Sequence, residues 1–229
     1  MKIGIIAAMD QELQLLVDKL DTKRITTRLG KTYYSGKLGK HEVVLVQSGI
    51  GKVISAMSVA VLVDFFDVDA IINTGSAGAV GKGIAIGDVV VATRLVYYDV
   101  DVTAFGYAYG QMATQPLYFE SDEHFIAVFE EILKEQDIDS HIGLIATGDS
   151  FIACQDKNDS IKKAFPDVLA VEMEGAAIAQ AAYATKRPFI VVRAMSDTAS
   201  HDANITFDEF IIEAGKRSAQ MLIAFLEKL

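Results

Sequence analysis

Residues 70–78 read Ala-Ile-Ile-Asn-Thr-Gly-Ser-Ala-Gly, and this stretch decides the fold class that we predict. Its first part, residues 70–73, is almost wholly apolar and β-branched, which is typical of a central strand buried on both faces of a sheet. The small residues 74–78 follow directly. Open α/β sheets bind ligands at the carboxyl ends of their strands, where small residues allow a close approach to the backbone. The stretch therefore predicts an α/β sheet with a ligand site at this strand end.

Strand and helix patterns alternate along the rest of the chain. Apolar or alternating runs predict further strands at residues 3–7, 25–29, 32–38, 43–47, 88–92, 141–146, 169–173 and 188–194. Helical periodicity predicts a helix that buries Leu13, Leu16, Val17 and Leu20, and helices near residues 52–66, 122–135, 157–165, 175–185 and 207–229. No composition break divides the chain, so we expect one α/β domain, residues 1–229, with a mixed sheet.

Composition excludes several classes of protein. The chain has 229 residues, with 21 Lys plus Arg against 31 Asp plus Glu and a formal net charge of −10, which argues against partners such as nucleic acid or anionic membranes. An apolar content of 51% excludes a disordered chain. No apolar run approaches the ~20 residues of a membrane span, and a single cysteine suits a reducing compartment. We expect a soluble, cytoplasmic protein.

Acidic residues follow three of the predicted strands. Glu174 and Asp197 come directly after strands, and Glu12 lies one helical turn beyond the first strand. Buried carboxylates are costly, so acids at such positions tend to be paired, capping or functional. Ordinary alternatives remain open: Glu12 on the solvated surface, Asp197 as a helix cap, and Glu174 paired with Arg193. If its strand continues, Glu172 shares a face with Glu174.

Other common catalytic chemistries lack their sequence signals. The four histidines do not have metal-ligand spacing, and no G-x-S-x-G nucleophile motif is present. Cys154 has no histidine close in sequence, and we expect it to be a buried, inert thiol. What remains is acid–base chemistry by carboxylates, without a metal or a cofactor.

Six ordered blocks of sequence resemble one known family. They are Ala7–Glu12 (AAMDQE), Ser48–Lys52 (SGIGK), Asn73–Gly78 (NTGSAG), Asp101–Tyr107 (DVTAFGY), Val171–Glu174 (VEME) and Arg193–Asp197 (RAMSD). Together they closely resemble the bacterial 5′-methylthioadenosine/S-adenosylhomocysteine nucleosidases, which have the nucleoside phosphorylase fold. The resemblance spans essentially the whole chain. It implies an α/β three-layer sandwich around a mixed, partly barrel-like sheet, a homodimer, and hydrolysis of adenine thionucleosides without cofactor or metal.

The resemblance also implies roles for individual residues. Glu12 resembles the base that activates water, Asp197 the acid that protonates adenine N7, and Glu174 the group that binds the ribose hydroxyls. The implied substrate-binding residues at the sugar are Ser76 and Arg193 near the water and the carboxylate, Gly78 in the same strand-end cluster as Ser76, and Met173 on the sugar. Those around the rest of the ligand are Phe151, Ile152 and Ser196 around adenine, Ala8 and Met9 in the first loop, and Ile50, Tyr107 and Phe207 in the alkylthio pocket. Val102 and Phe105 are implied to reach the neighbouring subunit's pocket.

These roles agree with the chemistry of the bond. Cleavage of an N-glycosidic bond passes through an oxocarbenium-like sugar, so it needs an acid on the leaving-base side and a carboxylate on the water side. Asp197 must hold a proton to act as the acid, and we therefore predict that its pKa is raised. Methylthioadenosine, S-adenosylhomocysteine and 5′-deoxyadenosine all carry this bond.

The segment 95–119 holds seven of the chain's twenty aromatic residues. Its glycines and polar residues fit neither one helix nor one strand, and aromatic residues are enriched at interfaces. We predict a loop that closes the site and joins a dimer, although core filling is the simpler alternative. Ala113 stands where relatives often have proline, which leaves the contact there open.

Three rival functions remain. A phosphorylase of the same fold would use phosphate in place of water, although an anionic Glu12 would repel phosphate. A related hydrolase would act on aminodeoxyfutalosine. A nucleoside-binding protein would need no catalytic acids, so the presence of Glu12, Glu174 and Asp197 together weighs against it.

Overall fold

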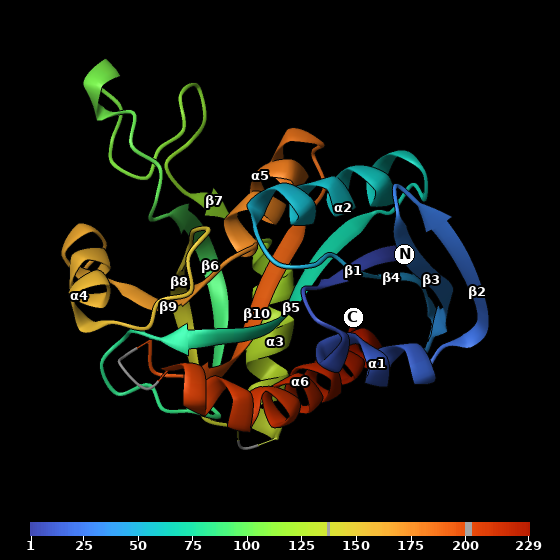
Figure 1. Cartoon of the computed structure of the whole chain (residues 1–229). Helices are drawn as coiled ribbons and strands as arrows, with labels where there is room; N and C mark the ends of the chain where they lie inside the picture. Colours follow the sequence, from blue (N-terminus) through green and yellow to red (C-terminus); the bar gives the residue numbers. More distant parts are fainter. Residues whose placement is uncertain (137, 200–202) are drawn as a thin grey trace.

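The computed structural model describes residues 1–136, 138–199 and 203–229, without the side chains of residues 11, 12 and 204–206. The strands are β1 (Lys2–Ala7), β2 (Asp21–Arg28), β3 (Lys31–Leu38), β4 (His41–Gln47), β5 (Ala70–Ala79), β6 (Val89–Tyr97), β7 (Phe119–Glu120), β8 (Ser140–Thr147), β9 (Val168–Glu172) and β10 (Phe189–Asp197). The helices are α1 (Asp10–Asp18), α2 (Lys52–Asp64), the short 3-10 helix η1 (Thr103–Phe105), α3 (Glu123–Glu135), α4 (Gln155–Ala164), α5 (Gly175–Ala184) and α6 (Ala203–Lys228). They alternate as the sequence predicts (Figure 1).

The strands form one mixed sheet that closes on itself. β10 pairs with β6 on one side and with β5 on the other, so β10, β6, β8, β9 and β5 complete a five-stranded barrel. From β5 the sheet continues outward through β1, β4, β3 and β2. β10 is parallel to β5 and antiparallel to β6. The predicted mixed, partly barrel-like sheet is confirmed.

Helices cover both faces of this sheet (Figure 1). α2 and α5 pack on one face, where Val59, Leu62 and Ile178 belong to one apolar cluster. α1, α3 and α6 pack on the other, where Leu13 and Phe129 belong to a second cluster. The predicted apolar face of the first helix is buried as expected, because its hydrophobic side chains recur with helical spacing. The sheet is thus enclosed between two layers of helices.

Three barrel strands run further than their apolar cores predict. β5 continues through the small residues to Ala79, β6 to Tyr97 and β10 to Asp197. Backbone pairing explains the extension, since Gly75 pairs with Arg193 and Gly78 with Asp197 along the β5–β10 ladder. The small-residue cluster that we predicted after a strand therefore lies within one. Ladder hydrogen bonds from neighbouring barrel strands outweigh the poor strand propensity of glycine and serine.

Two further features of the chain concern its surface. Cys154 is exposed just before α4, so the prediction of a buried thiol is wrong. It lies in the connection between β8 and α4 and belongs to none of the clusters of buried apolar residues. In the described part of the chain, no helix combines the length and the apolar character needed to cross a membrane.

Candidate active site

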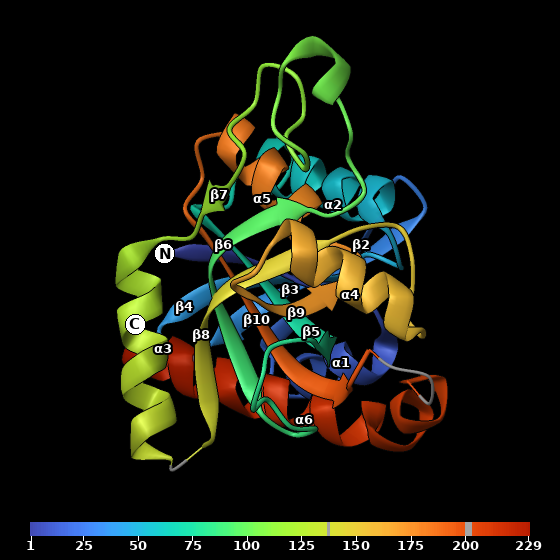
Figure 2. The same cartoon turned by 90° about the vertical axis from the view of Figure 1, so that its left-hand side faces the viewer.

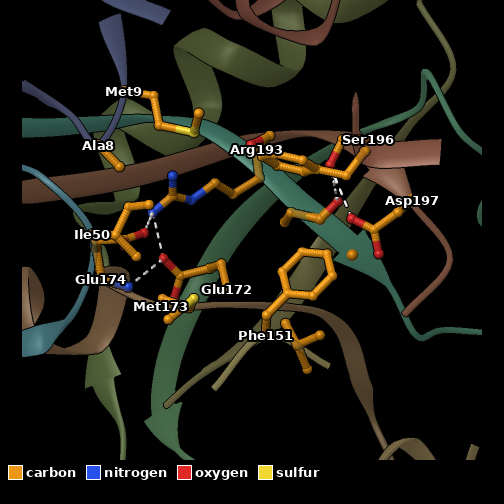
Figure 3. Close-up of a pocket in the computed structure, with 15 residues that line it drawn as sticks. Ala8, Met9, Ile50, Phe151, Glu172, Met173, Glu174, Arg193, Ser196 and Asp197 are labelled. Carbon is orange, nitrogen blue, oxygen red and sulfur yellow. Dashed lines mark hydrogen bonds and ion pairs between the residues drawn. The ribbon is translucent and has the colours of Figure 1, made fainter. Parts of the chain in front are cut away.

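A pocket opens where β5, β9 and β10 end, beside the loops that follow β1 and β4 (Figure 3). The predicted site residues that line it are Ala8, Met9, Ile50, Ser76, Gly78, Phe151, Met173, Glu174, Arg193, Ser196, Asp197 and Phe207. Ile152 lines a small adjoining cavity together with Phe151 and Asp197. Segments separated by up to almost the whole length of the chain are thus brought to one end of the sheet.

Three predicted residues with described side chains line neither cavity. Tyr107, Val102 and Phe105 lie in the segment between β6 and β7, which projects away from the sheet in two perpendicular views (Figures 1 and 2). Phe105 is 81% exposed. Glu12 falls in the first turns of α1, but its side chain lies outside the described part of the structure. Tyr107, Val102 and Phe105 therefore do not line the pocket of their own chain.

Asp197 is the last residue of β10, and its carboxylate is only 2% exposed. Oδ1 accepts a hydrogen bond from the Ala199 backbone N–H at 2.8 Å, and Oδ2 accepts one from the Ser196 hydroxyl at 3.0 Å. Burial raises the pKa of Asp197, although these two hydrogen bonds oppose the shift. The direction is the one that a proton-donating acid requires. The alternative of a helix cap does not hold, since Asp197 ends a strand.

Because Gly78 has no side chain, it leaves room for the Asp197 carboxylate. A Cβ on Gly78 would lie 2.7 Å from Asp197 Oδ1 and 3.0 Å from the Ala199 Cβ. Real Cβ atoms do not approach other atoms so closely, and the carboxylate is held by the Ala199 N–H. A side chain at position 78 would therefore displace the acid.

The first prediction follows from this contact. Gly78→Ala should lower kcat by about 10- to 100-fold, because a displacement near one ångström at a reacting group has effects of this size. Steady-state kinetics on the folded variant measure it. Gly143→Ala is the matched control: its Cβ also meets an atom at 2.8 Å, but that atom is the end of the flexible Leu169 side chain, away from the pocket. Equal activities of the two variants would contradict the assigned role of Gly78.

Arg193 lies in the middle of β10 and is almost completely buried, with 1% exposure. Its Nη2 donates to Asn73 Oδ1 at 2.6 Å, forms a hydrogen-bonded ion pair with Glu172 Oε2, and lies 3.5 Å from Glu174 Oε2. Asn73 is held in turn, because its Nδ2 donates to the Ile6 carbonyl at 2.9 Å. One guanidinium is thus shared by two carboxylates. The predicted pairing of Glu174 with Arg193 is present.

Glu174 is 4% exposed and stands at the N-cap position of α5. β9 ends at Glu172, so Glu172 and Glu174 do not alternate along one strand face as the sequence suggested. Instead the chain turns into the helix between them. Glu174 Oε1 accepts a hydrogen bond from the Gly51 N–H at 3.0 Å, where a φ of 105° favours glycine.

Aromatic rings border the other part of the pocket. Phe151 and Phe207 meet edge to face, with ring centroids 5.6 Å apart and an interplanar angle of 77°. Phe151 is 43% exposed, so a face of its ring remains available to a planar ligand. In Figure 3, Ser196 and Asp197 lie at one end of the site and Glu172 and Glu174 at the other.

Glu172 is the buried functional candidate that sequence reasoning left without a role. It lines the pocket and contacts Arg193. The family resemblance implies a role for Glu174, two residues later, but none for Glu172. A signal was available, since an acid at the end of an apolar strand is costly unless it is partnered. Among the described residues, no group of three or more His, Cys, Asp or Glu is arranged to hold a metal ion.

Comparisons with known proteins agree on the relatives of this chain. The model of the phosphorylase superfamily matches residues 2–227. A 5′-methylthioadenosine/S-adenosylhomocysteine nucleosidase of Staphylococcus carnosus is 44% identical over 99% of this chain and all of its own length.

Solved structures agree as well. An S-adenosylhomocysteine nucleosidase of Streptococcus pyogenes, in complex with 5-methylthiotubericidin, is 68% identical with a TM-score of 0.99, covering all of this chain and 97% of that one. A 5′-methylthioadenosine/S-adenosylhomocysteine nucleosidase of Streptococcus pneumoniae, with a transition-state inhibitor, is 67% identical with a TM-score of 0.97, covering 100% and 99%. The chain therefore belongs to the phosphorylase superfamily and, within it, to the family of 5′-methylthioadenosine/S-adenosylhomocysteine nucleosidases.

Proposed function

We propose that the chain hydrolyses the N-glycosidic bond of 5′-methylthioadenosine and S-adenosylhomocysteine, and also of 5′-deoxyadenosine, to adenine and the corresponding sugar. The observation that carries the proposal is Asp197, a buried carboxyl with a raised pKa at one end of a pocket that has two further carboxylates at the other. Family membership supports the same substrates. Such a reaction serves methionine salvage and removes by-products of S-adenosylmethionine.

The chemistry is assigned to the two ends of the pocket. Asp197, steadied by Ser196, donates its proton to adenine N7 as the bond to the sugar breaks, which makes the base a better leaving group. Phe151 stacks on adenine, and the Ile152 backbone reads its edge. Glu12 takes a proton from the attacking water on the opposite face of the sugar, following the logic of an inverting glycosidase.

The sugar end depends on negative charge. Glu174 accepts hydrogen bonds from the ribose hydroxyls, and its carboxylate stabilises the positive charge that develops on the ring. Ser76 and Arg193 hold the water and the carboxylates, while Met173 packs against the sugar. Met9, Ile50 and Phe207 offer apolar surface to the 5′-alkylthio group.

Water is favoured over phosphate as the nucleophile. Arg193 is the one cation among the described residues that line the pocket, and Glu172 and Glu174 already share its charge. A phosphate dianion needs additional cations or a nest of N–H donors. Hydrolysis therefore fits the charge balance of this site better than phosphorolysis does.

One incubation distinguishes these reactions. The protein is mixed with 5′-methylthioadenosine with and without inorganic phosphate, and adenine and the sugar are identified by chromatography and mass spectrometry. We expect adenine and free methylthioribose at a rate that phosphate does not change. Methylthioribose 1-phosphate would identify a phosphorylase instead, and binding without turnover would identify a nucleoside-binding protein.

We further propose a homodimer in which Val102 and Phe105 reach the site of the neighbouring subunit. The segment that carries them stands off its own chain, and beside it α2 and α5 line an apolar groove that includes Val53 and Ala181. Val53 is 74% exposed. An apolar projection beside an apolar groove fits a two-fold arrangement, in which the projection of each copy covers the groove of the other.

The dimer gives the second prediction. Wild-type protein should sediment as a dimer, and Phe105→Asp should shift it towards monomer and lower kcat/KM, because a desolvated charge opposes association. Ile25→Asp is the control, since Ile25 is 63% exposed on β2, outside the groove. A wild-type monomer at all concentrations would refute the proposal.

A further inference from the structure

Glu172, which has no assigned role, accepts hydrogen bonds from four groups in the described structure of the site. Its Oε1 accepts a hydrogen bond from the Thr147 hydroxyl, and its Oε2 accepts bonds from the Glu174 N–H at 3.0 Å and the Gly175 N–H at 2.7 Å. Arg193 Nη2 donates to the same Oε2. Four donors therefore meet a side chain that is 2% exposed. A carboxylate has about four acceptor sites, so most of its capacity is used within the protein, with three donors at Oε2 and one at Oε1.

Through these bonds Glu172 fastens the start of α5 to the barrel. The first N–H groups of a helix have no partner within the helix, and a carboxylate there is stabilised by the helix dipole. Thr147 adds a third tie, because its Oγ1 accepts the Ala176 N–H at 2.8 Å. Thr147 and Glu172 are paired across β8 and β9. We call their hydrogen bonds to the start of α5 the clamp, and its two side chains come from neighbouring strands of the barrel. The N-cap residue that it holds in place is Glu174.

The clamp also divides the charge at the sugar end. One guanidinium, that of Arg193, faces two carboxylates, and it is hydrogen-bonded to Glu172 but 3.5 Å from Glu174. Glu172 therefore competes with Glu174 for the positive charge of this one guanidinium. A carboxylate near the sugar stabilises the positive charge that develops on the ring, so this competition bears on the negative charge that Glu174 presents there.

Space around Glu172 shows that its position is specific. A Cβ on Gly175 would lie 3.0 Å from Glu172 Oε1 and 2.6 Å from Leu95 Cδ2. The carboxylate thus packs directly beneath the first turn of α5, with no room for another side chain. Movement of Glu172 would be passed to the helix start.

From these contacts we propose that Glu172 is a positioning residue for the hydrolysis: it holds Arg193 and the start of α5 so that Glu174 keeps its place and its negative charge at the ribose. The inference rests on the proposed function, since it concerns the same reaction. Glu172 acts through Glu174 and Arg193 and does not itself touch the reacting atoms.

The decisive measurement is a double-mutant cycle on hydrolysis of 5′-methylthioadenosine. Glu172→Gln keeps the size of the side chain but removes its charge, and it should lower kcat by about 10- to 100-fold. Adenine binds at the Asp197 end, so its affinity, measured by calorimetry, should not change. In the Glu174→Gln background the same substitution should cost at most a few-fold, because its target is already lost.

Two further variants keep the test valid if Glu172→Gln does not fold. Thr147→Val removes the hydroxyl that bonds to Glu172 and should lower kcat in the same Glu174-dependent way, whereas Thr147→Ser should restore it. Glu120→Gln, an identical change on the exposed end of β7, is the control and should behave as wild type.

The outcomes separate the inference from the proposed function. Equal losses from Glu172→Gln in both backgrounds, or a parallel loss of adenine affinity, would show that Glu172 supports the fold alone and would overturn the inference. Full activity of Thr147→Val would overturn it as well. Failure of the wild-type protein to release adenine would instead refute the proposed function.

Discussion

Asp197→Asn should lower kcat by about 10²–10⁴-fold while leaving nucleoside binding largely intact. The amide keeps the shape of the side chain and can still meet the Ser196 hydroxyl, but it has no proton to give to adenine. In the wild type, burial raises the pKa of this carboxyl and keeps the acid form available at higher pH than for an exposed aspartate. The loss should therefore appear in the chemical step rather than in KM.

The pH dependence has a definite sign. Since the acid form is the active one, kcat of the wild type should fall as pH rises through the raised pKa of Asp197, and this limb should be missing from the Asn variant. Kinetics from acid to alkaline pH, with calorimetric binding of the substrate to the slow variant, measure both effects. Asp156→Asn, a change on exposed α4, is the control. Near-native turnover of Asp197→Asn would overturn the assignment.

Stability should change in the opposite direction to activity. A carboxyl with a raised pKa in the folded state binds its proton more tightly there than in the unfolded chain. Its cost to folding is absent below the ordinary pKa near 3.8 and is fully present once pH exceeds the raised value. Asp197→Asn removes that cost, so its free energy of unfolding should exceed that of wild type at neutral pH.

Glu12→Gln should lose kcat by a similar factor, about 10²–10⁴-fold, for a different reason. The proposed base takes the proton from water, and a neutral amide cannot accept it. Glu12 belongs to α1, which begins shortly after the end of β1. Because β1 and β5 are parallel, this places position 12 near the carboxyl ends of the strands.

Kinetics and binding again separate the two steps. Glu12→Gln should bind 5′-methylthioadenosine with nearly wild-type affinity while releasing adenine slowly, and added phosphate should not restore the rate. Glu42→Gln, on the exposed face of β4, provides the control. Wild-type turnover of Glu12→Gln would remove Glu12 from the mechanism and leave the activation of water to other groups.

Much of the local structure follows from short-range pattern. Helical spacing in the segment around Leu13 and Leu16, and apolar runs such as residues 70–73, identified elements that the structure contains. The pattern underestimated strands such as β5, whose glycine and serine residues have weak strand propensity. Their strand conformation comes from pairing with β10, a partner more than a hundred residues away.

The motif positions were readable in the sequence, whereas their contacts were not. Asp197 and Glu174 follow predicted strands, so their place near the strand ends could be inferred. The close fit of Gly78 to Asp197, and the sharing of Arg193 between Glu172 and Glu174, depend on the register of β5, β9 and β10. The hydrophobic periodicity of a single segment does not show how that segment is aligned with a distant strand.

The sequence by itself determined the class of fold, the family and the acids that carry the proposed chemistry, because periodicity and motif residues are local properties of the chain. Only the tertiary structure decided which strands close the barrel and that Glu172 belongs to the site. Both follow from long-range pairing, which brings β10 between β5 and β6 and seats one buried guanidinium between two carboxylates. Buried charges must find partners, and the closed barrel determines which partners lie within reach.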